Sequence, residues 1–189
     1  ISSVRFDWDW KDVVPKAGER KQKILERYTG AMEAMKDVGM EPPTLVLSNP
    51  PEWAAELYRK DKDAFFRSYE EYVSTVAEAL ATTGLKVEEA QLFNEINHSF
   101  LFKYVDIEDL PKIAGIARKT LSRAQPEIKL STSLIVGNLN DAIAQRTGAP
   151  TLDEFLAKHE QMLQENFDRV SLDYYPGMWH YPVKKATKE

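Results

Sequence analysis

Short apolar stretches recur roughly 40 residues apart along this sequence, and each is followed by a segment long enough for a helix. Stretches of this length that end in polar residues are typical of buried β-strands. We therefore predict five strands, at 4–8, 44–48, 88–93, 128–133 and 167–172. The alternation of single strands with helices indicates a parallel sheet with right-handed crossovers.

Between the predicted strands, apolar residues recur three and four positions apart, which is the spacing of an amphipathic helix packed on a core. Gly39 and Gly84 follow two of these segments, and glycine is the residue best suited to ending a helix. Thr151 and Glu154 have the spacing of a capping box, which predicts that a helix begins there. The predicted helices are 19–38, 63–83, 109–124 and 151–165.

The third predicted strand ends in the polar pair Asn94 and Glu95. In parallel sheets and barrels, the side chains at the carboxyl ends of the strands face the ligand site. A carboxylic acid placed there can exchange a proton with a bound substrate. We therefore predict that Glu95 is an acid/base residue and that the Asn94 amide orients a hydroxyl-rich substrate. The alternative is that the pair only begins a polar loop.

The composition is that of an ordinary globular domain. The chain has 189 residues, of which 43% are hydrophobic and 29% charged, so we predict a single domain over 1–189. No apolar stretch approaches membrane-spanning length, so we expect no membrane partner. The net charge of −5 and the lack of a basic stripe argue against a nucleic-acid partner.

Several common chemistries lack support in the sequence. The eight glycines are scattered singly, which argues against a loop that binds dinucleotides or phosphates. The chain has no cysteine, and His98, His159 and His180 lack the spacing of a metal site. A Gly-x-Ser-x-Gly elbow is absent as well. We therefore expect no cofactor and no metal.

Carboxylate, amide and aromatic side chains are instead concentrated where the predicted strands end. Carboxylates that move protons, together with flat rings that stack on sugars, favour a carbohydrate site. The residues in question are Asp7, Trp8, Trp10, Asn49, Trp53, Asn94, Glu95, Asp173, Tyr174, Tyr175 and Trp179.

Through Asn94-Glu95 the chain resembles the (β/α)8-barrel retaining glycoside hydrolases of clan A, whose fourth strand ends in Asn-Glu with the Glu as acid/base. Residues 4–6 and 170–176 resemble the second and sixth strands of that clan. Residues 91–97 and the Tyr-Tyr-Pro-x-x-Trp motif that begins at Tyr174 are similar to endo-β-1,4-galactanases. The resemblance implies an α/β fold, a TIM-barrel segment of about five consecutive parallel β/α units.

The resemblance also implies roles for individual residues. Arg5 would support the catalytic carboxylate, Asn94 would bind a 2-hydroxyl of the substrate, and Tyr175 would contact the nucleophile. The implied enzyme is a glycoside hydrolase that cleaves β-linked polysaccharide or oligosaccharide by a retaining two-carboxylate mechanism. We expect such a protein to be extracellular or periplasmic.

Three further candidates carry two interpretations each. Trp53 and Trp179 are candidate sugar platforms, although Trp also fills the mouths of barrels. Asp173 stands where some clan members have His, and it could equally cap a loop.

The resemblance leaves the second catalytic carboxylate unassigned. The nucleophile of the clan ends its seventh strand, whereas Glu189 is the last residue here and has no predicted strand before it. We therefore expect the nucleophile outside this chain, in a missing remainder of the barrel or a second chain, or else a half-barrel without activity. The alternatives from other classes are a non-catalytic carbohydrate-binding barrel and an open α/β module that binds another small ligand.

A partial barrel would leave its inner face without a cover. We expect that face to be apolar and to meet water. The candidate inner residues are Val4, Phe6, Leu45, Leu47, Leu92, Leu130, Val170 and Leu172.

Overall fold

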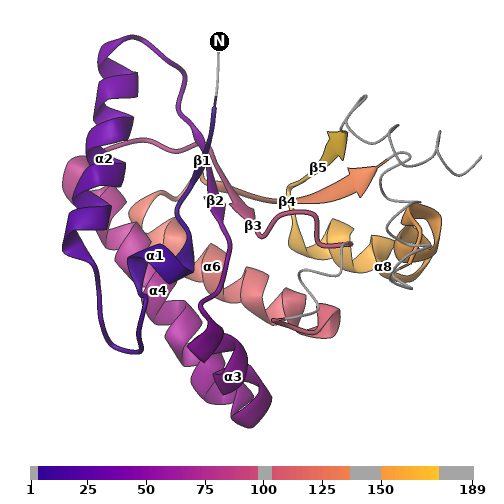
Figure 1. The fold of residues 1–189 in the computed structure, drawn as a ribbon. Helices are drawn as coiled ribbons and strands as arrows, with labels where there is room; N and C mark the ends of the chain where they lie inside the picture. Colours follow the sequence, from indigo (N-terminus) through magenta and orange to yellow (C-terminus); the bar gives the residue numbers. More distant parts are fainter. Residues whose placement is uncertain (1–3, 98–103, 137–149, 175–189) are drawn as a thin grey trace, which may run out of the picture.

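A computed structural model describes residues 4–97, 104–136 and 150–174 of the chain (Figure 1). Strands and helices alternate along the described residues, as predicted. In chain order the elements are β1 (Arg5–Asp7), α1 (Trp10–Val13), α2 (Gln22–Asp37), β2 (Thr44–Leu47), α3 (Glu52–Lys60), α4 (Lys62–Thr83), β3 (Glu89–Leu92), η1 (Ile107–Asp109), α6 (Leu110–Ala124), β4 (Lys129–Val136), α8 (Leu152–Asn166) and β5 (Arg169–Tyr174).

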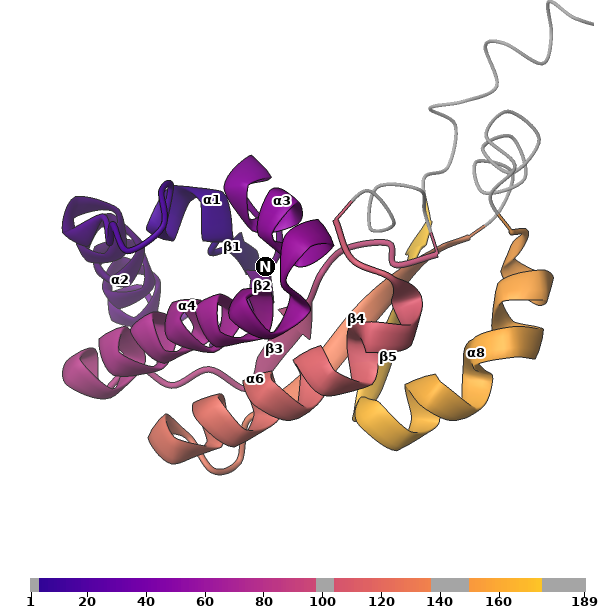
Figure 2. The same cartoon turned by 90° about the horizontal axis from the view of Figure 1, so that it is seen from below.

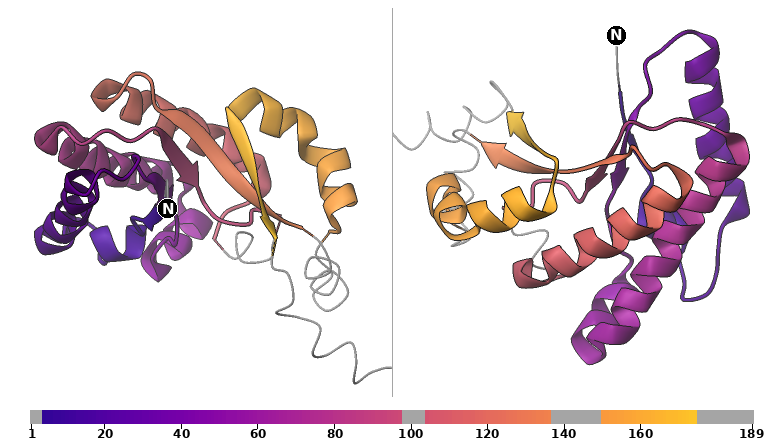
Figure 3. Two further views of the ribbon diagram at one scale, coloured as in Figure 1. Left: turned by 90° about the horizontal axis from the view of Figure 1, so that it is seen from above. Right: turned by 180° about the vertical axis from the view of Figure 1, so that it is seen from behind.

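The five strands form one sheet in the order β1-β2-β3-β4-β5, and every neighbouring pair is parallel. The predicted succession of five parallel β/α units is therefore confirmed. Each crossover carries at least one helix, and helices α4, α6 and α8 lie side by side along one face of the sheet (Figures 2 and 3). Among the described helices, none is both long and apolar enough to cross a membrane.

Most element boundaries agree with the sequence prediction, and the capping box is present. The Thr151 hydroxyl accepts from the backbone N–H of Glu154, whose carboxylate accepts from the backbone N–H of Thr151. The short helices α1 and α3 are absent from the prediction, because polar strand-end residues precede both and conceal the start of a helix. Helix α3 begins at Glu52, directly after Pro51, in a segment that sequence patterning assigns to the exit of a strand.

The expected position of the apolar strand residues is wrong. Leu45, Leu47, Leu92 and Leu130 are at most 1% exposed and belong to the core between the sheet and the helices. Phe6 packs edge-on against Tyr28 of α2, so it also faces the helices. Two-residue alternation separates the two faces of a strand but does not say which face becomes concave.

The concave face is consequently polar rather than apolar. The strand register places one polar row on it, made of side chains that alternate with the buried leucines. This row contains Arg5, Asp7, Glu89, Gln91, Ser131, Ser133, Arg169 and Asp173.

Apolar exposure is instead found at the edge strand β5. Val170 and Leu172 are 38% and 62% exposed, and they pair with Thr132 and Leu134 of β4 on the helix-facing side. Exposed apolar strand residues were expected here, but on the other face. Because β5 is the last described strand, no described helix packs beyond it.

An aromatic cluster joins the exit of β1 to helix α4. Trp8 and Trp10 are fully buried, and Trp10 stacks on Tyr72 with ring centroids 5.3 Å apart. The Tyr72 hydroxyl donates to the backbone oxygen of Trp8. Both tryptophans therefore belong to the core, and neither is the exposed sugar-stacking ring that their place at a strand end suggests.

Candidate active site

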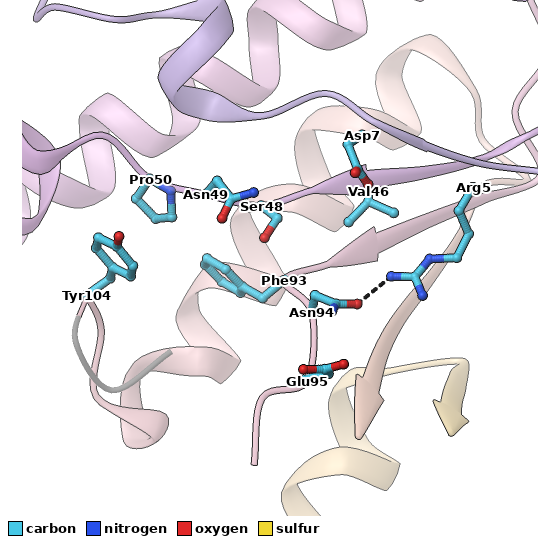
Figure 4. A pocket seen from close by; sticks show the side chains of 10 residues that line it. All are labelled: Arg5, Asp7, Val46, Ser48, Asn49, Pro50, Phe93, Asn94, Glu95 and Tyr104. Atoms are coloured by element: carbon cyan, nitrogen blue, oxygen red, sulfur yellow. Dashed lines mark hydrogen bonds between the residues drawn. The ribbon is translucent and has the colours of Figure 1, made fainter. Parts of the chain in front are cut away.

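A pocket of about 550 Å³ opens at the carboxyl ends of β1, β2 and β3 (Figure 4). This is the end of the sheet where the sequence places the functional residues. The lining residues are Arg5, Asp7, Val46, Ser48, Asn49, Pro50, Phe93, Asn94, Glu95 and Tyr104. The predicted site residues Arg5, Asn94 and Glu95 are therefore brought together in one pocket.

The backbone at the exit of β3 is strained. Phe93 and Glu95 have φ angles of +58° and +52°, in the left-handed region that residues with a side chain seldom adopt. Such conformations persist only where the surrounding structure holds them, and they concentrate at functional sites. Here the neighbouring strand β4 holds the segment, because the N–H of Ile96 donates to the backbone oxygen of Ser133 at 2.9 Å.

Asn97 continues the attachment of this segment to β4. Its Nδ2 donates to the backbone oxygen of Ile135 at 3.0 Å, and its Oδ1 accepts from the N–H of Ile135 at 2.9 Å. The side-chain amide thus takes the place of a backbone peptide where the β3–β4 ladder has ended. Asn97 is 1% exposed, so these two bonds satisfy buried polar atoms of both residues.

The Asn94 side chain is oriented by its neighbours. Its Oδ1 accepts from an Arg5 guanidinium nitrogen, from Gln91 Nε2 at 3.2 Å and from Ser133 Oγ at 3.1 Å. Arginine has donors only, so the atom that faces it must be the carbonyl oxygen of the amide. The Nδ2 group is therefore the side of Asn94 that can donate to a hydroxyl of a ligand.

Arg5 spans the concave face of the sheet. It donates from Nη1 to Asp173 Oδ1 at 3.1 Å and also contacts Asn94, as Figure 4 shows for the latter bond. Asp173 lies on β5 and Arg5 on β1, so the two outermost described strands are joined by side chains. The sheet must be strongly curved for this contact, which is the geometry of a barrel rather than of an open α/β sheet.

Glu95 is half-buried in the wall of the pocket, next to Asn94 (Figure 4). Its backbone N–H donates to Ser133 Oγ at 2.9 Å. A half-buried carboxyl group beside an oriented amide and a guanidinium can exchange a proton with a polar substrate. The role of Glu95 as an acid/base residue stays a prediction.

A buried carboxylate that sequence reasoning missed holds the pocket-lining residue Asn49. Asp9 is 9% exposed, and its Oδ1 accepts from Asn49 Nδ2 at 2.8 Å. Asn49 lines the pocket and has a φ angle of +48°, so its strained position is held by this bond. Burial raises the pKa of Asp9 above its ordinary value, and the Asn49 bond and the Lys11 charge oppose that rise. No local motif marks Asp9, because its partner comes from the next strand exit.

Asp9→Asn is expected to stabilise the protein at neutral pH. The neutral amide avoids the burial of a charge, and its carbonyl still accepts from Asn49. The raised folded-state pKa means that the folded protein binds the Asp9 proton more tightly than the unfolded chain does, so the wild type loses stability as pH rises through that pKa. The advantage of the variant should therefore shrink as pH falls toward the ordinary aspartate value of about 3.9.

Thermal unfolding of both proteins between acidic and neutral pH measures this effect. The exposed Glu127→Gln is the control, with an expected change within about 0.5 kcal/mol throughout. A less stable Asp9→Asn at neutral pH would mean that the attraction of Lys11 outweighs the burial of Asp9.

The remaining predicted site residues fall outside this group. Trp53 lies in α3 and packs edge-on against Trp10, with ring centroids 5.7 Å apart, and it does not line the pocket. Its role as a sugar platform stays a prediction. Tyr175 and Trp179 lie outside the described residues.

The structure adds Tyr104 to the pocket wall. It precedes helix α6, and no pattern in the sequence marks it as a site residue. Within the described ranges, no three His, Asp or Glu side chains gather in a way that could hold a metal ion.

The chain is similar to known glycoside hydrolases in sequence and in fold. The family model described as Glycosyl hydrolase family 53 matches residues 18–189. No curated protein matches the chain. Among solved structures, the chain is similar to beta-glycosidase BGL167, with a TM-score of 0.63 and 16% identity over 92% of this chain. It is also similar to a Family 1 b-glucosidase from Thermotoga maritima, with a TM-score of 0.61 and 16% identity over 93% of this chain.

A third similar structure is the Ignisphaera aggregans GH53 catalytic domain, with a TM-score of 0.59 and 18% identity over 93% of this chain. The alignments cover 51%, 50% and 49% of these three structures, so the chain spans about half their length. At such low identity the likeness concerns the fold. It confirms that the five units are a segment of a (β/α)8 barrel.

Proposed function

We propose that this chain, which belongs to glycosyl hydrolase family 53, forms the acid/base side of a retaining glycoside hydrolase that cleaves β-linked polysaccharides or oligosaccharides. The observation that carries the proposal is the pocket in which Glu95 lies beside an Asn94 amide oriented by Arg5. The pocket combines carboxylate, amide, hydroxyl and guanidinium groups with two aromatic rings, a mixture that suits a substrate rich in hydroxyl groups.

In the proposed mechanism, Glu95 donates its proton to the glycosidic oxygen while the bond from that oxygen to the anomeric carbon breaks. A second carboxylate attacks the anomeric carbon and forms a glycosyl-enzyme intermediate. Glu95, now ionised, then removes a proton from water, which attacks the same carbon and releases the sugar with its original configuration.

Asn94 and Arg5 orient the reactants in this proposal. The Asn94 Nδ2 group donates to a hydroxyl next to the reacting carbon, because its carbonyl oxygen is already occupied by Arg5, Gln91 and Ser133. Arg5 supplies a fixed positive charge at the centre of the concave face, between Asn94 and Asp173. Such a charge supports a neighbouring catalytic carboxylate.

We place the nucleophile outside this chain. A retaining mechanism needs two carboxyl groups about 5–5.5 Å apart. Of the described residues that line the pocket, Asp7 is the other carboxylate beside Glu95, and it projects from β1, whereas the clan's nucleophile ends the seventh strand. The intact enzyme would receive its nucleophile from a further part of the barrel. We also place the enzyme in an extracellular or periplasmic compartment, where polymeric substrates are found.

The test is the stereochemistry of the first product. The intact enzyme is incubated with β-linked galactan, glucan and mannan oligosaccharides, and proton NMR follows the anomeric signals before mutarotation. We expect hydrolysis of at least one substrate, with the β-anomer formed first. Formation of the α-anomer first would contradict the retaining mechanism. Binding without hydrolysis would favour the alternative of a non-catalytic carbohydrate-binding barrel.

A further inference from the structure

We propose that Ser133 is a positioning residue that holds Asn94 and Glu95 in the geometry needed for proton transfer. The inference rests on the function proposed above for these two residues. Ser133 lies on β4, is fully buried, and is not among the residues that line the pocket. Any effect on the reaction must therefore pass through its neighbours.

The hydroxyl of Ser133 contacts three polar groups of the β3 exit. Its Oγ accepts from the backbone N–H of Glu95 at 2.9 Å and from Gln91 Nε2 at 3.2 Å. It donates to Asn94 Oδ1 at 3.1 Å. A serine hydroxyl has one donor and two acceptor positions, so these three bonds use its full capacity. The group has nothing left to offer a substrate, which distinguishes it from a catalytic residue.

The backbone of Ser133 holds the same segment. Its carbonyl oxygen accepts from the N–H of Ile96 at 2.9 Å. One residue of β4 therefore contacts three consecutive residues after β3, namely the Asn94 side chain and the backbone N–H groups of Glu95 and Ile96. Because Glu95 has a left-handed backbone, the direction of its carboxyl group depends on these bonds.

Loss of the hydroxyl alone has a predictable consequence. In Ser133→Ala, the N–H of Glu95 loses its bond to Ser133 Oγ, and Asn94 Oδ1 loses one of its three donors. The strained segment can then relax, and the Glu95 carboxyl group moves away from its productive position. A displacement of about 1 Å in a catalytic group lowers the rate about 100-fold.

The same strand provides a matched control. Ser131 lies two residues earlier on the same face, is also fully buried, and donates from Oγ to Glu89 Oε1 at 2.6 Å. Glu89 begins β3, so this bond lies at the opposite end of the sheet from the pocket. Ser131→Ala therefore removes a buried, hydrogen-bonded serine hydroxyl from the same strand without removing a contact to residues 94–96.

The experiment compares Ser133→Ala with Ser131→Ala in the intact enzyme. We measure kcat, KM, the free energy of unfolding and the hydrogen-exchange rate of the Glu95 amide. Both variants should lose stability, Ser133→Ala more than Ser131→Ala, because the Ser133 hydroxyl makes three hydrogen bonds and the Ser131 hydroxyl makes one. Ser133→Ala should lower kcat about 10- to 100-fold with little change in KM, and it should accelerate exchange at Glu95. Ser131→Ala should change neither kcat nor that exchange rate.

Equal losses of kcat in the two alanine variants, or unchanged exchange at Glu95 in Ser133→Ala, would overturn the inference. Ser133→Cys, which keeps the volume and a weak acceptor, should fall between Ser133→Ala and the wild type, and it serves if the alanine variant does not fold. The exchange measurement needs no catalysis, so it separates the two proposals. A wild type that hydrolyses no glycan contradicts the proposed function, whereas protection of the Glu95 amide by Ser133 is decided regardless.

Discussion

Glu95→Gln is expected to lower kcat of the intact enzyme about 10²- to 10⁴-fold on substrates with poor leaving groups. The amide cannot donate the proton that such a leaving group needs. Aryl glycosides with activated leaving groups need little protonation, so their glycosylation step should lose much less. Glu95 lines the pocket from a position held by Ser133, so the isosteric amide should bind in the same place.

Added azide separates a catalytic from a structural role for Glu95. This small anion can attack the glycosyl-enzyme intermediate without a general base, so it should partly restore turnover of activated substrates by Glu95→Gln. The exposed Glu127→Gln, which changes a carboxylate before β4, should leave both substrate types unaffected. Equal loss on poor and activated substrates, with no rescue by azide, would show that Glu95 is structural.

Arg5→Ala should be the second most damaging change, lowering kcat/KM about 100-fold or more. The guanidinium donates to both Asn94 and Asp173, so its removal frees the amide and leaves the carboxylate of Asp173 unpaired. Asp173 is largely buried, at 14% side-chain exposure, so an unpaired charge there is costly. Arg5→Lys keeps the charge but cannot make both bonds with one planar fork, so it should recover only part of the activity.

The control for Arg5 is Arg20→Ala, measured by the same steady-state kinetics and by thermal unfolding. Arg20 donates to Glu78 at 3.0 Å, nearly the same distance as in the Arg5–Asp173 bond. The side chains of Arg20 and Glu78 are both exposed. Its loss should leave kcat/KM unchanged and alter the unfolding free energy by at most about 1 kcal/mol. Similar kinetics for Arg5→Ala and Arg20→Ala would remove Arg5 from the site.

Three hydrogen bonds in and around the proposed site join segments that are far apart in sequence. Arg5 and Asp173 are 168 residues apart, Arg5 and Asn94 are 89 apart, and Asp9 and Asn49 are 40 apart. A parallel barrel makes such contacts routine, because every strand ends at the same rim. The variants of Asp9, Ser133 and Arg5 therefore test the barrel geometry as well as individual residues.

The order of the five strands and the four longer helices between them was determined by the sequence alone. Apolar runs separated by amphipathic segments specify alternating β and α elements, and the parallel sheet follows from that alternation. The capping box at Thr151 and Glu154 is local chemistry, so it too could be predicted from four residues. The place of Asn94 and Glu95 at the end of a strand followed in the same way.

Only the tertiary structure decided which face of the sheet is concave. Strand periodicity is the same for both faces of a sheet, so the sequence allows Leu45 and Leu92 on either face. In the structure both residues lie in the core between the sheet and the helices. The hydrogen bonds of Ser133 to the exit of β3, and of Asp9 to Asn49, likewise depend on the tertiary structure, because each joins neighbouring strand exits. A hydrogen bond between distant segments leaves no periodic trace in the chain, because it depends on where the strands lie in space rather than on the residues beside each partner.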